Sequence, residues 1–204
     1  MNLPNKLTIS RVIMIPVFIL FFYLNFTGHM FVAFGVFLIA SLTDLLDGKI
    51  ARKYNLVTNL GKFLDPIADK VLVLSALTVF LTAPWIFTGF LDYWALIVAG
   101  CGVAVILARE IIVSGFRMVA ADAGIVIAAD KIGKYKTVMQ DIAVAVLLIG
   151  AGFTELIPTV NIAAFTTCAK VINYAGLVCF AVSVILTVIS GVNYIVKNIR
   201  VLKV

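Results

Sequence analysis

The chain has 204 residues, of which 63% are hydrophobic and only 13% charged, and its mean hydropathy is +1.16. Because ordinary globular domains carry about 25% charged residues, this composition excludes a soluble domain. The net charge of +6 is divided among short segments between apolar runs. That pattern argues against a nucleic-acid partner and favours contact with anionic membrane lipids. We therefore expect an all-α integral membrane protein with one domain over residues 1–204.

Apolar runs of about 20 residues, the length that a transmembrane helix needs, predict six helices. The first, Leu7–Phe26, is too long for a removable signal peptide and lacks its cleavage site, so we expect a retained helix after a juxtamembrane segment. The other predicted helices are, in chain order, Phe31–Lys53, Leu60–Leu81, Trp94 to about Ala120, Thr137–Phe153, and a last one from about Val171.

The basic residues decide how often the C-terminal stretch crosses the membrane, since Asn161–Asn198 could be mistaken for two spans. With six helices, every basic residue except Lys170 lies on one side, which the positive-inside rule makes cytoplasmic. A seventh helix would put the basic C-terminus on the other side. We expect a multi-pass protein of the cell membrane with both termini in the cytoplasm, and an interfacial segment at Thr159–Lys170 on the outer surface.

The cysteines and the single histidine suggest no chemistry. Cys101, Cys168 and Cys179 lie in apolar segments at unrelated spacings, which predicts neither a disulfide framework nor a zinc site. We expect them to be small buried residues. His29 lies in a short polar turn, where we expect a solvated side chain rather than a metal ligand.

Four aspartates lie close together in the stretch TDLLDGKIARKYNLVTNLGKFLDPIADK, residues 43–70. Asp44 and Asp47 share one face of the second predicted helix, and Asp65 and Asp69 share a face of the third. The short loop between these helices makes them antiparallel neighbours, so the two acidic faces can meet at their cytoplasmic ends. Four ionised carboxylates there would repel one another and be costly to desolvate.

A cluster of oxygen donors favours a hard divalent cation such as Mg²⁺ or Mn²⁺. The alternative is pairing with nearby basic side chains, but the helical spacing directs Lys49 and Lys53 away from the aspartate face. Small residues on the acidic faces, Gly48, Ala51 and Gly61, allow either close helix packing or the approach of a bulky group. A diphosphate whose oxygens bridge two divalent ions is one such group.

The same stretch matches the signature Asp-x-x-Asp-Gly-x-x-Ala-Arg, eight residues, Gly-x-x-x-Asp-x-x-x-Asp. The matching positions are Asp44, Asp47, Gly48, Ala51, Arg52, Gly61, Asp65 and Asp69. In this signature the chain resembles the CDP-alcohol phosphotransferases, and the resemblance extends to six helices over nearly the whole chain.

This resemblance implies a reaction and a role for each signature residue. A CDP-linked lipid such as CDP-diacylglycerol binds through its diphosphate to two divalent ions, an alcohol attacks the phosphorus next to the lipid, and CMP leaves. Asp44, Asp47 and Asp65 are expected to bind metal, and Asp69 both to approach the metals and to act as general base. The small residues Gly48, Ala51 and Gly61 would accommodate the cytidine nucleotide, with Arg52 on its phosphate. The resemblance also implies a homodimer.

Segments elsewhere resemble the family members whose acceptor is sn-glycerol 3-phosphate: residues 2–11, 108–110, 114–117 and 133–137. An anionic acceptor needs cations, which Arg109 and Arg117 on the fourth predicted helix and Lys134 and Lys136 before the fifth could supply. The first helix could add hydrogen bonds from Asn5 and Thr8. The alternative is that the cations only follow the positive-inside rule, with Glu110 as a simple salt-bridge partner of Arg109.

Two other functions stay open. Another acceptor in the same family is possible, such as inositol phosphate, or phosphatidylglycerol in cardiolipin synthesis, although a neutral or zwitterionic acceptor would leave four cations without a role. A divalent-cation transporter could use the same carboxylates, but it would place them near the middle of the bilayer. Here they cluster at the cytoplasmic edge, which favours the transferase.

Overall fold

The computed structural model describes residues 3–54, 59–88, 93–122, 131–160 and 163–198. Within these ranges, side chains are described except at residues 3–7, 44–67, 69, 88, 93, 121–122 and 131.

All regular structure in the described residues is helical, which confirms the predicted fold class at the level of secondary structure. The long helices are α1 (Leu3–Tyr23), α2 (His29–Tyr54), α3 (Asn59–Phe80), α5 (Tyr93–Asp122), α6 (Lys131–Val160) and α7 (Ala163–Asn198). A short helix, α4 (Trp85–Thr88), lies between α3 and α5 and was not predicted. The first four predicted helices end within a few residues of the observed ones.

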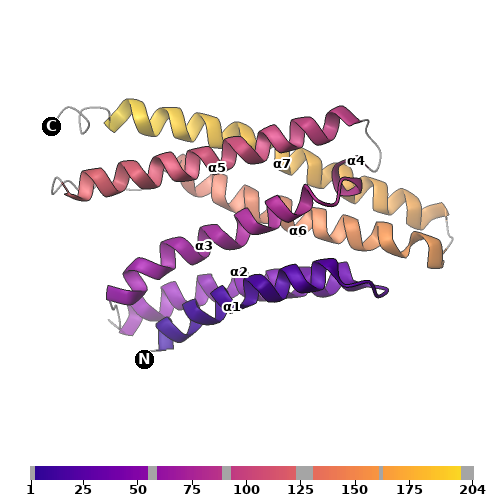
Figure 1. Ribbon diagram of the computed structural model, residues 1–204, viewed down its shortest axis with the longest axis horizontal. Coiled ribbons are helices and arrows are strands. Elements are labelled where there is room, and N and C mark those ends of the chain that lie inside the picture. Colours follow the sequence, from indigo (N-terminus) through magenta and orange to yellow (C-terminus); the bar gives the residue numbers. More distant parts are fainter. Residues whose placement is uncertain (1–2, 55–58, 89–92, 123–130, 161–162, 199–204) are drawn as a thin grey trace.

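Successive long helices run back and forth along the molecule, so the start of α1 and the end of α7 lie at the same end (Figure 1). We call this the terminal end. The opposite end, which holds the turn at residues 24–28 and helix α4, we call the turn end. Six membrane spans and the cytoplasmic position of both termini stay predictions.

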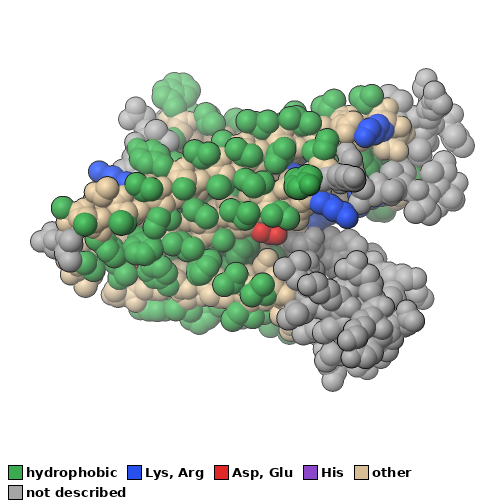
Figure 2. All heavy atoms as spheres, turned by 180° about the vertical axis from the view of Figure 1, so that it is seen from behind, with side chains coloured by type: hydrophobic (Ala, Val, Ile, Leu, Met, Phe, Trp, Pro, Cys, Tyr) green, Lys and Arg blue, Asp and Glu red, His purple; other side chains and the backbone are tan. Residues whose placement is uncertain are grey.

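Three helices are long and apolar enough to cross a membrane: Trp94–Ala120, Ile132–Val160 and Ala163–Asn198. The first half of the chain contributes shorter apolar helical stretches, which are Thr8–Tyr23, His29–Thr43 and Lys70–Phe80. These helices are counted among the described residues alone. Figure 2 shows hydrophobic side chains over most of one face, with basic side chains mainly toward the terminal end, another basic group at the turn end, and an acidic group nearer the middle.

Two kinds of contact hold the bundle together. Aromatic rings fill the space between α1, α2 and α3, where Phe22 stacks on Phe80 at 5.9 Å between ring centroids. Small residues bring α6 and α7 together, because a Cβ atom on Gly176 would lie 2.8 Å from Leu147 Cδ2. A Cβ on Gly150 would lie 3.2 Å from the backbone of α7. Helices that approach this closely fix the relative positions of the polar side chains they carry.

The fifth and sixth predicted helices were too short. α6 extends from Lys131 to Val160 because its polar ends have partners on other helices, as described below. The predicted interfacial segment Thr159–Lys170 is wrong as a separate element, since α6 continues to Val160 and α7 already begins at Ala163. One continuous helix, α7, accounts for the stretch that could have contained two spans.

Two predictions about single side chains were also wrong. Cys101 and Cys168 are exposed and Cys179 is partly exposed, because the outer faces of helices in an apolar bundle also consist of apolar residues. The side chain of His29 is only 13% exposed. Its Nδ1 lies 3.2 Å from the carbonyl oxygen of Phe21, and its Nε2 lies 3.7 Å from Glu155. The polar turn that carries His29 packs against α6, which removes it from solvent.

Candidate active site

The backbone places the two pairs of aspartates at the terminal end. Asp44 and Asp47 lie in the last turns of α2, and Asp65 and Asp69 lie in the first turns of α3. These positions confirm that the pairs lie on consecutive helices with the predicted helical spacing. The side chains of all eight signature residues, and that of Asn5, lie outside the described part of the structure. Their roles as metal, nucleotide or acceptor ligands and as general base therefore stay predictions.

Next to the aspartate helices, the carboxylate of Glu110 on α5 binds cations from three helices. Arg109 Nη1 donates to Glu110 Oε1 at 2.9 Å, and Lys136 on α6 donates to the same oxygen. Lys70 on α3 lies 3.3 Å from the other oxygen, Oε2. We call Lys70, Arg109, Glu110 and Lys136 the Glu110 cluster. Among the described residues this one carboxylate faces three cations, so the four side chains of the cluster together carry a net charge of +2.

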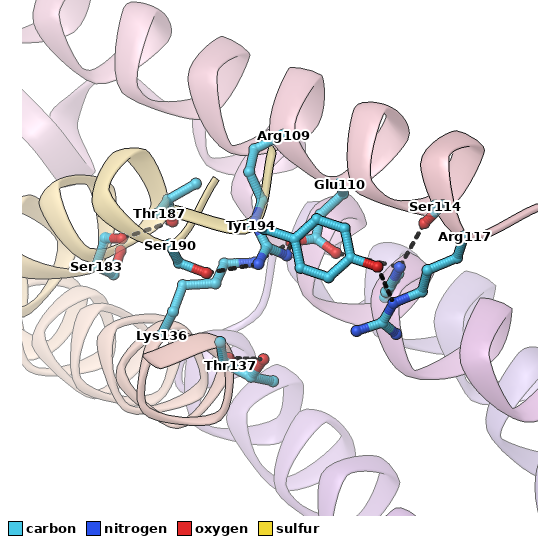
Figure 3. Close-up of polar contacts among 12 residues, drawn as sticks. Arg109, Glu110, Ser114, Arg117, Lys136, Thr137, Ser183, Thr187, Ser190 and Tyr194 are labelled. Atoms are coloured by element: carbon cyan, nitrogen blue, oxygen red, sulfur yellow. Dashed lines mark hydrogen bonds and ion pairs between the residues drawn. The ribbon is translucent and has the colours of Figure 1, made fainter. Parts of the chain in front are cut away.

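The side chain of Arg109 is fixed by contacts with α7 as well as by Glu110. Its Nη2 donates to Ser190 Oγ on α7 at 2.6 Å (Figure 3). A Cβ on Gly191 would lie 3.0 Å from Arg109 Cγ, so this glycine makes room for the side chain. Its buried Nε has no hydrogen-bond partner among the described residues. A guanidinium fixed in this way is ready to meet an anion without further ordering.

The four predicted acceptor cations fall into two groups. Arg109 and Lys136 belong to the Glu110 cluster, and the side chain of Lys136 is only 2% exposed. Arg117 and Lys134 are exposed. Arg117 Nε donates to the hydroxyl of Tyr194 at 3.3 Å, and its guanidinium carbon lies 5.6 Å from the centroid of that ring. The structure therefore brings Arg109 and Lys136 together and leaves the other two nearer the solvent.

α1 contributes two buried polar residues on one face. Thr8, a predicted acceptor ligand, is completely buried, and so is Arg11, one turn further along the helix. Charged residues are rarely buried completely unless they are paired. Arg11 was not predicted as a site residue, because the positive-inside rule alone accounts for a basic residue near the start of the first helix.

Sequence reasoning also missed Lys70, whose ammonium group donates to Ser114 Oγ at 2.6 Å. Lys70 lines a small pocket together with Glu110, Lys136, Thr137 and Gln140. The amide Nε2 of Gln140 is buried and has no hydrogen-bond partner among the described residues. The signal that could have found Lys70 is its position in the chain, directly after Asp69 and at the start of a long apolar run.

Comparisons with known proteins agree with the signature. The model of the CDP-alcohol phosphatidyltransferase family matches residues 1–189. The chain belongs to this family. The chain is 38% identical to the CDP-diacylglycerol–glycerol-3-phosphate 3-phosphatidyltransferase of Bacillus subtilis, over 99% of this chain and 97% of the relative. It is 36% identical to the proteins of the same name from Rickettsia typhi and Escherichia coli K12, in both cases over 95% of this chain, and over 94% and 93% of the relatives.

As a CDP-alcohol phosphatidyltransferase, the protein is an enzyme, and both its signature and the Glu110 cluster lie within the matched residues. The likeness to these relatives covers almost all of both chains, so the shared region includes the signature and the cations that were predicted to bind an anionic acceptor.

Proposed function

We propose that the protein transfers the phosphatidyl group of CDP-diacylglycerol to sn-glycerol 3-phosphate, which gives phosphatidylglycerophosphate and CMP. The observation that carries this proposal is the Glu110 cluster, whose excess positive charge lies on helices next to the signature aspartates. An acceptor that already carries a phosphate dianion matches this excess, whereas a neutral alcohol would leave it uncompensated. The names of the relatives support the same pair of substrates.

The signature carboxylates fit two divalent cations, Mg²⁺ or Mn²⁺. The backbone of α2 and α3 gives each aspartate pair the spacing of one helix face, and oxygen donors are the ligands that these cations prefer. Asp44, Asp47 and Asp65 would hold the cations, with Asp69 approaching them. When bound, the cations supply charge neutralisation for the diphosphate of the lipid nucleotide.

The reaction is an in-line displacement at the phosphorus next to the lipid. Asp69 accepts the proton of the acceptor hydroxyl, and that oxygen forms the new bond to phosphorus. The bond between this phosphorus and the oxygen of the CMP phosphate breaks, and CMP leaves with the electron pair. On the donor side, Gly48, Ala51 and Gly61 leave room for the cytidine nucleotide, and Arg52 binds its phosphate.

On the acceptor side, Arg109, Arg117, Lys134 and Lys136 attract the phosphate of glycerol 3-phosphate, while Asn5 and Thr8 add hydrogen bonds. The exposed pair of cations meets the acceptor first, and the more deeply placed Arg109 fixes it. Because Arg109 is already oriented by Glu110 and Ser190, little side-chain entropy is lost when the phosphate binds.

We further propose that the six long helices form one membrane domain over residues 1–204, with both termini and the active site on the cytoplasmic side, and that the enzyme is a homodimer. The basic residues at the terminal end support this orientation. Tags at both termini should be protected from protease in sealed right-side-out vesicles. An accessible C-terminal tag would contradict the orientation.

The experiment that tests the proposed function offers purified protein CDP-diacylglycerol and a set of labelled acceptors, and then identifies the lipid product. The set contains glycerol 3-phosphate, inositol phosphate, phosphatidylglycerol and serine. We expect phosphatidylglycerophosphate with glycerol 3-phosphate and little product with the others. A preference for inositol phosphate would support a transferase with another acceptor. If none of the acceptors gave a lipid product, the transferase function itself would be contradicted.

A further inference from the structure

We propose that Lys70 is an additional ligand of the acceptor phosphate, a role that rests on the function proposed above. Lys70 lies on α3, directly after Asp69, and its ammonium group reaches across to α5. Among the described residues of the Glu110 cluster, it alone comes from one of the two helices that carry the signature aspartates. It therefore connects the predicted general base with the cations of the acceptor side.

The contacts of Lys70 leave it able to bind one more group. Its ammonium donates to Ser114 Oγ at 2.6 Å and lies 3.3 Å from Glu110 Oε2. A lysine ammonium has three N–H donors, so these two partners leave one donor that no other described residue takes. The two partners come from one helix face of α5, since Glu110 and Ser114 are four residues apart.

The burial of the three cations shows which of them an incoming anion can reach. The side chain of Lys70 is 29% exposed, whereas those of Arg109 and Lys136 are 14% and 2% exposed. Glu110 thus holds Lys136 inside the bundle and holds Lys70 nearer the surface. A phosphate that approaches the excess charge of the cluster meets Lys70 before it can meet Lys136.

The position of Lys70 also suits the geometry of the reaction. The acceptor has to present a hydroxyl to Asp69 while its phosphate stays bound. A ligand on the residue after Asp69 ties the phosphate to the same helix as the general base, so that small movements of α5 and α6 do not separate them. Holding two reacting groups in one frame in this way is a large source of rate enhancement.

The alternative role for Lys70 is purely structural, a salt bridge that ties α3 to α5. The two roles differ in which measured quantities change. Removing Lys70 still leaves Glu110 paired with Arg109 and Lys136, so a purely structural Lys70 predicts that Lys70→Gln lowers the temperature of thermal unfolding and changes both KM values together. If Lys70 binds the acceptor, only the acceptor KM should rise.

The test measures initial rates of phosphatidylglycerophosphate synthesis for the full-length enzyme in detergent micelles, varying each substrate in turn. We expect Lys70→Gln to raise the KM for glycerol 3-phosphate by about tenfold or more, the effect of one lost charge-assisted hydrogen bond, with less than about a twofold change in the KM for CDP-diacylglycerol. Lys70→Arg should recover part of this loss.

Lys197→Gln is the matched control, because it removes an exposed positive charge from the last turn of α7 at the same end of the bundle. It should leave both KM values unchanged. If Lys70→Gln does not fold, Ser114→Ala decides, since it removes the partner that orients Lys70 while keeping every charge. We then expect the acceptor KM to rise by about threefold or more.

An unchanged acceptor KM in Lys70→Gln, or an equal rise in both KM values, would overturn the inference. So would an unchanged acceptor KM in Ser114→Ala if that variant has to decide. Failure of the proposed function is separate and visible in the wild-type enzyme, which would then make no phosphatidylglycerophosphate from glycerol 3-phosphate.

Discussion

Two glutamates on neighbouring helices, Glu110 on α5 and Glu155 on α6, have opposite surroundings. Glu110 is bound by three cationic side chains from α3, α5 and α6. Glu155, near the turn end, is bound by backbone amides instead: Gly28 N donates to its Oε1 at 2.6 Å, and Met30 N donates to its Oε2 at 3.4 Å. We call Glu155 with the amides of residues 28 and 30 the Glu155 clamp.

The Glu155 clamp caps the N-terminus of α2. The first amides of a helix have no partners within it, and a carboxylate there satisfies them and interacts favourably with the helix dipole. Here the carboxylate comes from another helix, so it also ties the turn between α1 and α2 to α6. Gly28 has a φ of 90°, a left-handed conformation that favours glycine and directs its amide to Glu155.

The difference between the two glutamates indicates which end of the molecule can bind a charged substrate. In the clamp, the donors and acceptors satisfy one another. In the Glu110 cluster, the described side chains keep a positive charge after the carboxylate has been compensated, which a purely structural contact does not need. We therefore expect changes at the terminal end to alter kinetics and changes at the clamp to alter stability. The following predictions test that division, beginning with the largest effect.

Removal of divalent cations should have the largest effect. We expect no measurable turnover in excess chelator and recovery on addition of Mg²⁺ or Mn²⁺, because four carboxylates at the terminal end need compensation before an anionic diphosphate can approach. The measurement is the rate of CMP release before and after chelation. Full activity in excess chelator would contradict the two-metal hypothesis and leave the aspartates without a role.

Asp69→Asn should have the next largest effect. We expect turnover to fall by at least about 10²-fold, which is the lower range for a missing general base. Binding of the lipid nucleotide should survive better than in Asp44→Asn, since Asp44 is expected to be a metal ligand only. Equilibrium binding of CDP-diacylglycerol to both variants measures this difference. Wild-type turnover in Asp69→Asn would mean that another group removes the proton.

Most of the helices and the placing of the aspartates could be predicted from the sequence, because local patterns determine them. The spacing of the aspartates fixes their helix faces, and apolar length locates most of the helices. The residues that sequence reasoning missed depend instead on contacts between helices. Lys70 meets Ser114 only because α3 packs against α5 in one particular rotation, and neither residue carries a local signal of that contact.

Glu110 shows the same limit in another form. Its pairing with Arg109 was one of the alternatives that the sequence left open, and the structure confirms it. The sequence could not reveal that Lys70 and Lys136 share the same carboxylate, since they lie 40 and 26 residues away along the chain. That sharing turns an ordinary salt bridge into a cluster with excess positive charge. The exposure of His29 was predicted wrongly for a related reason, because its partner Glu155 is far away along the chain and meets it only in the folded bundle.

Arg109→Gln should raise the acceptor KM, or lower the efficiency with the acceptor, by roughly 10–150-fold, the equivalent of a charge-assisted hydrogen bond worth about 1.5–3 kcal/mol. The KM for CDP-diacylglycerol should barely change. Lys134→Gln gives the matched comparison: its side chain is exposed, so its contribution should be smaller. Normal acceptor kinetics in both variants, and in Arg117→Gln and Lys136→Gln, would remove the physical support for glycerol 3-phosphate.

The smallest effect on catalysis should come from Glu155→Ala, which removes the clamp. Loss of a side chain that caps a helix costs about 0.5–2 kcal/mol of stability, so the temperature of thermal unfolding in detergent should fall by a few degrees. Glu155→Gln keeps one carbonyl acceptor and should cost less. Both variants should keep KM values for the two substrates within about twofold of wild type, since the clamp lies near the turn end. If Glu155→Ala instead raises the acceptor KM as much as Arg109→Gln does, the two ends are coupled through α6, and the division between a structural and a catalytic glutamate is wrong.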